Sequence, residues 1–218
     1  MITLRKVEEP DILQQKGGEW LQVLQDKIDA NEVPTNAEKT RYGHPQIKEA
    51  LIRETHGKCA YCESYLLHVT FGDVEHISPK SKRLDDTFRW FNLTLACDVC
   101  NTYKSDSIDL IDPYVDQPDE VFRFFGPMIY ARPDNAKGVA TLKKLQLNRP
   151  ALIERRTRKL DSIYSLVMIL HSADNPQIKA VLAHDLRVNE VGDDQEYAAF
   201  VRHYLASLED DIDLRPPE

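Results

Sequence analysis

The chain has 218 residues, which is enough for one large domain or two small ones. Its 42% hydrophobic content permits a real core, and its 29% charged content is ordinary for a soluble protein. No apolar run approaches the roughly 20 residues of a membrane span. Residues 1–7 lack the apolar core of a signal peptide, so we expect a cytoplasmic location. A net charge of −8 argues against a free-standing, non-specific DNA binder.

The charge is unevenly distributed. Residues 187–218 hold nine carboxylates against three arginines, a net charge of −6 that leaves the first 186 residues near neutral. The acids are Glu190, Asp193, Asp194, Glu196, Glu209, Asp210, Asp211, Asp213 and Glu218. This end can dock on a basic partner or shield a DNA site, and it can equally be a solvated helix face with an acidic tail.

The sequence pattern of residues 1–57 predicts two helices. In the first, four apolar residues recur at helical spacing, and Pro34 lies beyond its end. These four are Trp20, Leu21, Leu24 and Ile28. Pro45 starts the second helix, and His56-Gly57 is its predicted C-cap, because glycine adopts the left-handed conformation at low cost.

The chain after residue 106 is predicted to be a hairpin followed by helices. Asp112-Pro113 signals a turn, and the runs 121–125 and 128–130 flank Gly126-Pro127 as two short strands. Leucines 142, 145 and 147 then predict a short helix. A long helix is expected from Pro150, with Asn148 as its candidate cap, and further helices at 176–186 and 194–208.

All four cysteines lie in two C-x-x-C pairs that are 34 residues apart: Cys59, Cys62, Cys97 and Cys100. Each C-x-x-C turn presents two thiolates to one ion, and two such turns complete a tetrahedral zinc site. Four protein ligands leave no open position, so we expect the zinc to be structural. Redox-active thiols and unligated core cysteines are the alternatives, and they fit poorly with two complete pairs.

Three segments around these cysteines form one constellation: VEHISPKS at 74–81, FNLTLAC at 91–97 and CNTYKSD at 100–106. Together they resemble the HNH endonuclease family over residues 57–106. The resemblance rests on the pattern E-H-I-x-P-x-S, then N-L-x-L-x-C-x-x-C-N-x-x-K, in which every landmark is present in order. It implies a metal-dependent DNA endonuclease built on a ββα-metal module.

The chemistry of phosphodiester hydrolysis accounts for these residue types. A base must activate water, and a cation must stabilise the charge that develops on phosphorus and on the leaving oxygen. The resemblance implies that His76 is the general base and that Glu75 and Asn101 hold the catalytic ion. Oxygen ligands suit Mg²⁺, our first choice, with Mn²⁺ or Ni²⁺ as alternatives, since many members have Asp or His in place of Glu75.

Two further residues match the family pattern. Asn92 matches its middle landmark, where it is either catalytic or holds the motif loop by backbone hydrogen bonds. Lys104, one helical turn beyond Asn101, is either a phosphate contact or a solvated lysine. Successive strand residues point to opposite faces, so Glu75 and His76 can serve one site only if their strand bends or ends there.

Two basic clusters are weaker candidates for backbone contacts with nucleic acid. One follows the motif loop and comprises Lys80, Lys82, Arg83 and Arg89, and the other comprises Arg155, Arg156, Arg158 and Lys159. Exposure to solvent explains the first cluster as well as contact with nucleic acid does. Docking of a partner or exposure to solvent explains the second cluster better than contact with nucleic acid. We expect Trp90-Phe91 to pack beneath the motif.

The predicted fold class is α+β, a zinc-stabilised ββα-metal module flanked by N- and C-terminal helices. We divide the chain into an N-terminal helical segment (1–56), the HNH module (57–106), and a short hairpin with a mainly helical, partner-binding region (107–218).

The wider layout resembles the HNH subunits of Septu-type anti-phage systems, including retron-associated versions. The resemblance rests on LIDPY at 110–114, LNRPAL at 147–152 and EYAAFV at 196–201. It implies a DNA substrate and an ABC/SMC-like ATPase partner that controls the nuclease. In the retron-associated versions it also implies a reverse transcriptase and its reverse-transcribed DNA.

Two other functions stay open. A stand-alone HNH restriction or mobile-element nuclease would cut strongly as an isolated protein. A non-catalytic zinc-binding adaptor would have the cysteine framework without chemistry, which fits poorly with a complete set of Glu75, His76 and Asn101.

Overall fold

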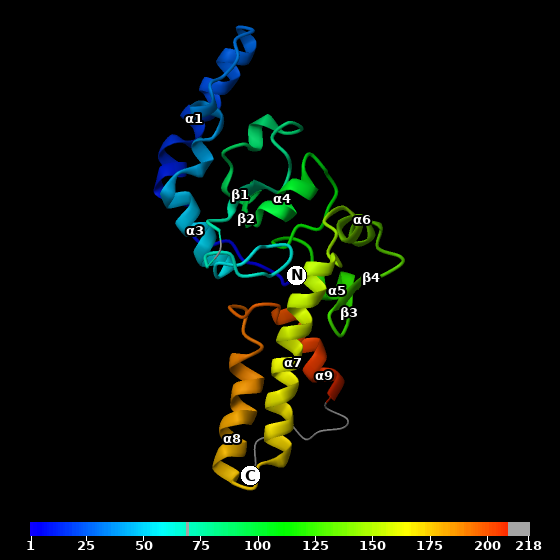
Figure 1. Ribbon diagram of the computed structural model, residues 1–218. Helices are drawn as coiled ribbons and strands as arrows, with labels where there is room; N and C mark the ends of the chain where they lie inside the picture. Colours follow the sequence, from blue (N-terminus) through cyan, green and yellow to red (C-terminus); the bar gives the residue numbers. More distant parts are fainter. Residues whose placement is uncertain (69, 209–218) are drawn as a thin grey trace. The chain divides into compact units, whose positions relative to one another are not determined.

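The computed structural model describes residues 1–68 and 70–208, and Figure 1 shows their path. The chain forms two compact units, one of residues 4–116 and one of residues 1–3 with 117–218. Five acids of the predicted acidic tail lie outside the described residues: Glu209, Asp210, Asp211, Asp213 and Glu218. Helices, small sheets and four clustered cysteines confirm the predicted α+β class. The three-part division of the chain stays a prediction.

The unit of residues 4–116 is built around a two-stranded sheet. Strand β1 (Asp73–His76) pairs antiparallel with β2 (Leu93–Ala96), with His76 opposite Leu93. Helix α3 (Pro45–Thr55) packs on β2, and α4 (Asp98–Lys104) packs on β1. All four β2 residues are buried, as in the interior of a much larger sheet. The order β1, β2, α4 is the predicted ββα module.

Two helices of the N-terminal segment and several shorter helical elements complete this unit. Helix α1 (Asp11–Asp29) contains the four residues of the predicted apolar stripe, but of these only Leu24 is buried and Ile28 is 47% exposed. Helix α3 begins at Pro45 as predicted. Both residues of the predicted cap, His56 and Gly57, have positive φ. The shorter elements are α2 (Asn36–Lys39), η1 (Arg41–Gly43), η2 (Leu84–Asp86) and η3 (Trp90–Asn92). Within η3 the packing prediction was half wrong: Trp90 is buried, but Phe91 is 60% exposed.

In the unit that contains residues 117–208, a β-hairpin packs against helices. Strands β3 (Phe122–Phe125) and β4 (Met128–Ala131) flank Gly126, whose φ of 53° suits the tight turn. Helix α5 (Pro118–Val121) contacts β3, and α6 (Ala136–Lys144) contacts β4. The long α7 (Pro150–Ser172) buries a stripe of residues spaced three or four apart and contacts both α8 (Pro176–His184) and α9 (Ala198–Leu208).

Two boundary predictions in this unit were wrong. Asn148 does not cap α7, because its amide binds both backbone groups of Ile129 at 3.0 and 2.7 Å and so joins β4 instead. Arg149 is the N-cap residue and has no side-chain cap bond. Helix α9 begins at Ala198 rather than 194, directly after Tyr197, which has a left-handed φ of 58°. A π-helical turn (Asp185–Asn189) follows α8.

None of the described helices combines the length and the apolarity that a membrane crossing requires.

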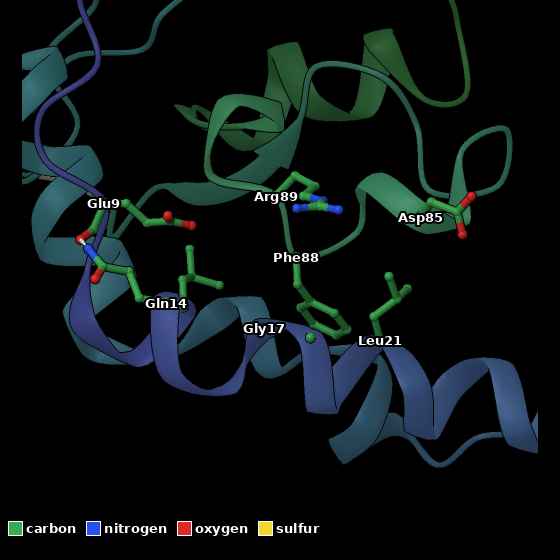
Figure 2. Close-up of a pocket in the computed structure, with 9 residues that line it drawn as sticks. Glu9, Gln14, Gly17, Leu21, Asp85, Phe88 and Arg89 are labelled. Carbon is green, nitrogen blue, oxygen red and sulfur yellow. Dashed lines mark hydrogen bonds between the residues drawn. The ribbon is translucent and has the colours of Figure 1, made fainter.

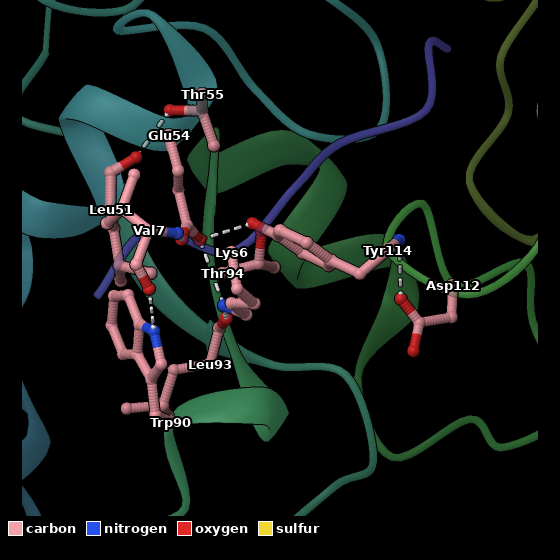
Figure 3. A network of polar contacts seen from close by, with 10 residues as sticks. All are labelled: Lys6, Val7, Leu51, Glu54, Thr55, Trp90, Leu93, Thr94, Asp112 and Tyr114. Atoms are coloured by element: carbon pink, nitrogen blue, oxygen red, sulfur yellow. Dashed lines mark hydrogen bonds and ion pairs between the residues drawn. The ribbon is translucent and has the colours of Figure 1, made fainter. Parts of the chain in front are cut away.

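A partly buried polar network attaches the N-terminal segment to the module (Figure 3). Lys6 Nζ lies 2.9 Å from the Glu54 carboxylate of α3, donates to Leu93 O of β2, and sits over the rings of Trp90 and Tyr114. Tyr114 Oη donates to Glu54 at 2.6 Å. Burial lowers the pKa of Lys6 and raises that of Glu54, and their mutual attraction opposes both shifts. The network therefore depends on each partner being present.

Replacing Glu54 with alanine should destabilise this unit by about 3 kcal/mol, because the change removes the carboxylate that pairs with the partly buried Lys6 ammonium and accepts from Tyr114 Oη. Urea unfolding measures the difference. Glu49→Ala is the matched control, since Glu49 is an exposed residue of the same helix and should change stability by less than about 0.5 kcal/mol. Equal effects of the two variants would contradict this account.

Candidate active site and cysteine cluster

The four cysteines converge as predicted. All four Sγ atoms lie within 4.8 Å of one another and are buried, and Cys62 Sγ is 3.9 Å from Cys97 Sγ. A tetrahedral ion with Zn–S distances of about 2.3 Å places its sulfurs about 3.8 Å apart. The donor type, number and spacing thus fit a structural zinc ion, and the cluster can hold one.

Local backbone structure presents these thiols. The first pair lies in a turn after α3 that is closed by Cys59 N donating to Ser64 O at 3.0 Å. Cys97 is the N-cap of α4, and its sulfur accepts from Cys100 N at 3.3 Å. Hydrogen bonding with Cys100 lowers the pKa of Cys62 and Cys97, whereas burial raises the pKa of Cys59. The second pair therefore fixes where α4 begins.

Strand β1 ends at His76, which resolves the question of how Glu75 and His76 can share a site. Both side chains line one pocket of about 320 Å³, together with Asn101 from α4. The other lining residues are Tyr42, Val74, Pro79, Lys80, Ser81, Ser105 and Asp106. The predicted base and the two predicted metal ligands are thus brought together.

His76 is held in a defined orientation. Its Nε2 lies 3.0 Å from Thr87 O, and because a carbonyl oxygen can only accept, Nε2 carries the proton and Nδ1 carries the lone pair. Burial lowers the pKa of His76 to about 4, with positive charge on Lys80 and Lys104 acting in the same direction. The imidazole is therefore neutral near pH 7 and can accept a proton at Nδ1.

Helix α1 supports the carbonyl that orients His76. Figure 2 shows the ring of Phe88 lying over α1 beside Gly17. A Cβ at Gly17 would lie only 3.4 Å from Phe88 O, and the ring of Trp20 meets Phe88 edge-on at 5.6 Å. The neighbouring Asp85 accepts from Gln25 of α1 at 2.8 Å. The N-terminal helix thus fixes the segment that presents Thr87 O.

Glu75 is paired with a buried lysine. Lys104 Nζ lies 2.7 Å from Glu75 Oε1 and donates to His76 O at 2.7 Å, and its side chain is 1% exposed. Burial raises the pKa of Glu75, whereas the charge of Lys104 lowers it. These contacts favour a positioning role for Lys104. The phosphate contact that the sequence suggested for it stays a prediction.

Asn101 is oriented by Asp73. Asn101 Nδ2 donates to Asp73 Oδ2 at 2.9 Å, which fixes the amide so that Oδ1 is its remaining acceptor. A carboxylate has two oxygens, so Glu75 can bind Lys104 with one while the other is available to a cation. A carboxylate and an amide oxygen in one pocket are donors that suit a hard divalent ion.

Asn92 braces the loop after His76. Its Oδ1 accepts from Ser78 N at 2.7 Å, and its Nδ2 donates to Ser78 O and Asp86 O, both at 3.0 Å. All three bonds go to the backbone and Asn92 is buried. This geometry matches the loop-holding interpretation of Asn92, while a direct catalytic role stays a prediction.

The basic clusters differ in their contacts. Near the pocket, Lys82 lies 4.0 Å from Asp106 and Arg83 lies 3.4 Å from Asp86, whereas Lys80 donates to Tyr42 Oη at 2.8 Å. On α7, Arg156 is buried, and the other three cations of the cluster are paired with carboxylates. These pairs are Arg155 with Glu196, Arg158 with Glu154 and Lys159 with Glu190. The α7 cluster therefore offers little free charge to a nucleic acid.

Three residues of this site were not found from the sequence: Tyr42, Asp73 and Thr87. Tyr42 comes from η1, more than 30 positions before the motif, and its ring meets that of His76 edge-on at 4.5 Å. Thr87 acts through its carbonyl group, which every residue type has. Asp73 could have been found, because it lies two residues before Glu75 on the same strand.

Comparison with known proteins agrees with this geometry. Residues 59–107 match the HNH endonuclease family model, so this segment is an HNH domain. The chain is similar to Septu protein PtuB of Bacillus thuringiensis, with 28% identity over 191 residues, 80% of this chain and 74% of that protein. It is also similar to Septu protein PtuB of Bacillus mycoides strain KBAB4, with 24% identity over 152 residues, 54% of this chain and 52% of that protein. Both resemblances seen in the sequence are confirmed.

Replacing Cys97 with serine should remove zinc and lower the melting temperature of the module, because a structural zinc ion contributes directly to folding. Metal analysis of the purified protein and thermal unfolding measure both effects. Asp98→Ala alters the exposed neighbouring residue and should retain the metal. Stoichiometric zinc together with wild-type melting in the serine variant would refute the cluster's structural role.

Proposed function

We propose that this protein is a metal-dependent DNA endonuclease that hydrolyses phosphodiester bonds at His76. One observation carries the proposal: a neutral histidine with an oriented lone pair shares a pocket with a carboxylate and an amide inside an HNH domain. That combination provides a base next to oxygen ligands for a divalent ion.

In the proposed reaction, His76 Nδ1 accepts a proton from the attacking water. The imidazolium that forms keeps its bond from Nε2 to Thr87 O, so the ring is not displaced during the transfer. Glu75 and Asn101 would hold the catalytic ion, Mg²⁺ by preference and otherwise Mn²⁺ or Ni²⁺. When bound, that ion supplies stabilisation of the negative charge on the phosphate and the leaving oxygen.

Two residues would act by positioning these groups. Lys104 anchors the Glu75 carboxylate and the end of β1, and Asn92 fixes the loop from Ser78 to Asp86.

His76→Ala should reduce nicking of supercoiled plasmid in Mg²⁺ or Mn²⁺ by at least about 100-fold, because general base catalysis typically contributes 10²–10⁴-fold. The variant should keep its zinc, since the cysteine cluster is untouched. His171→Ala, which alters an exposed histidine of α7, is the control and should cut like the wild type. Plasmid nicking at the wild-type rate by His76→Ala would exclude this mechanism.

We further propose that the nuclease works in an anti-phage complex under the control of an ABC/SMC-like ATPase. Similarity to the two Septu PtuB proteins supports this setting. An exposed apolar face on α8, where Ile178 and Val181 are three residues apart and 50% and 68% exposed, supports a partner-binding role for the region after residue 107. Association with a retron reverse transcriptase and its reverse-transcribed DNA stays a prediction.

Val181→Glu should weaken co-purification with an ATPase encoded beside this protein by at least about tenfold, because it places a charge in an apolar interface. The thermal stability of the isolated chain should not change, since the residue is exposed. Gln177→Glu adds the same charge at an exposed residue of the first turn of α8 and is the control.

The same experiments separate the alternative functions. A stand-alone nuclease would cleave DNA strongly as an isolated protein, and no ATPase would co-purify with it from its native cell. A zinc-binding adaptor would bind its partner and show no metal-dependent cleavage that is sensitive to His76→Ala.

A further inference from the structure

Tyr42 reaches the candidate active site from outside the HNH domain. It belongs to η1, whereas the HNH match begins at residue 59. Its ring meets the imidazole of His76 at a centroid distance of 4.5 Å and an interplanar angle of 87°. Such an edge-to-face contact restrains both rings. Tyr42 therefore forms a wall of the pocket and limits rotation of the proposed base.

The hydroxyl of Tyr42 makes a specific bond with Lys80. Lys80 Nζ donates to Tyr42 Oη at 2.8 Å and also lies over the tyrosine ring, 4.7 Å from its centroid. In this bond the hydroxyl accepts, so its own proton remains available to a further acceptor. The Lys80 ammonium has three N–H donors and uses one of them in the bond to Tyr42 Oη. The pair thus offers several donors at one place in the pocket wall.

Lys80 differs from its neighbours in having no carboxylate partner among the described residues. Lys82 and Arg83 in the same loop are near Asp106 and Asp86. Within residues 1–68 and 70–208, no carboxylate pairs with Lys80, whose recorded polar partner is a neutral hydroxyl. A cation and a hydroxyl proton that share a pocket with a general base present a surface complementary to an anionic oxygen.

We propose that the Tyr42–Lys80 pair binds a non-bridging phosphate oxygen of the nucleic acid at this site, while the Tyr42 ring positions His76. The inference rests on the proposed phosphodiester hydrolysis and adds a substrate-binding element supplied by the N-terminal segment. The two parts of the Tyr42 side chain thus have separate roles: the hydroxyl binds the phosphate oxygen, and the ring positions His76.

Four variants test this division: Tyr42→Phe, Tyr42→Ala, Lys80→Met and the double variant Tyr42→Phe/Lys80→Met. The phenylalanine keeps the ring against His76 and loses only the hydroxyl. Lys82→Met is the matched control, since it removes a charge from the same exposed loop but from a lysine that lies near a carboxylate. The measurements are kcat/KM for cleavage of a duplex oligonucleotide in Mn²⁺ and the affinity for that duplex without added Mn²⁺.

Tyr42→Phe and Lys80→Met should each lower kcat/KM and duplex affinity by about tenfold. The double variant should lose little more than either single variant, because each single change already breaks the same phosphate-binding pair. Lys80→Met should also reduce the salt dependence of binding by about one phosphate contact, and Lys80→Arg should restore it. Tyr42→Ala should lower kcat further than Tyr42→Phe, because it also frees the His76 ring.

The outcomes distinguish this inference from the proposed function. Wild-type cleavage and binding by Tyr42→Phe and Lys80→Met, with His76→Ala inactive, would overturn the inference and leave the nuclease assignment intact. Fully additive losses in the double variant would overturn the claim that the two residues act as a pair. Activity retained by His76→Ala would instead refute the proposed function itself.

Discussion

The candidate site depends on one buried charge, the ammonium of Lys104. A buried cation is costly unless it is paired, and Lys104 is paired twice, with the Glu75 carboxylate and with the backbone carbonyl of His76. Both partners belong to the last two residues of β1, so the ion pair joins the end of α4 to the end of the strand. Cys97 and Cys100 fix the other end of α4. Asn101 lies between these anchors, and its position follows from them.

Residues outside the HNH match contribute contacts to the candidate site. The carbonyl that orients His76 belongs to a segment held by α1, through the contact of Phe88 with Gly17 and Trp20. Lys6 and Glu54 attach the N-terminal segment to β2, and Tyr42 forms a wall of the pocket. The residues before position 59 therefore take part in the geometry of the site, although the family match does not include them.

How much of this was predictable from the sequence depends on the range of the interactions. The helix that starts at Pro45, the hairpin around Gly126 and the cysteine cluster were predictable because spacing and turn chemistry act locally. The capping role of Asn148 was mispredicted because a tertiary partner, Ile129, takes its amide. The exposure of Phe91 was missed for a related reason, since a 3₁₀ turn sends two adjacent aromatic side chains to different environments. The contacts of Tyr42 and Thr87 with His76 join distant segments, and no local pattern encodes them.

The distribution of charge bears on the proposal that an acidic chain acts on an anionic polymer. The chain carries a net charge of −8, but both carboxylates that line the pocket have lysine neighbours, Glu75 with Lys104 and Asp106 with Lys82. His76 is neutral, and Lys80 adds a positive charge that no described carboxylate balances. A divalent ion held by Glu75 and Asn101 would make the pocket more positive still. Local pairing of Glu75 and Asp106 would thus reduce the repulsion that the net charge imposes on a phosphate group, whereas the Asp73 carboxylate beside Asn101 would oppose this effect.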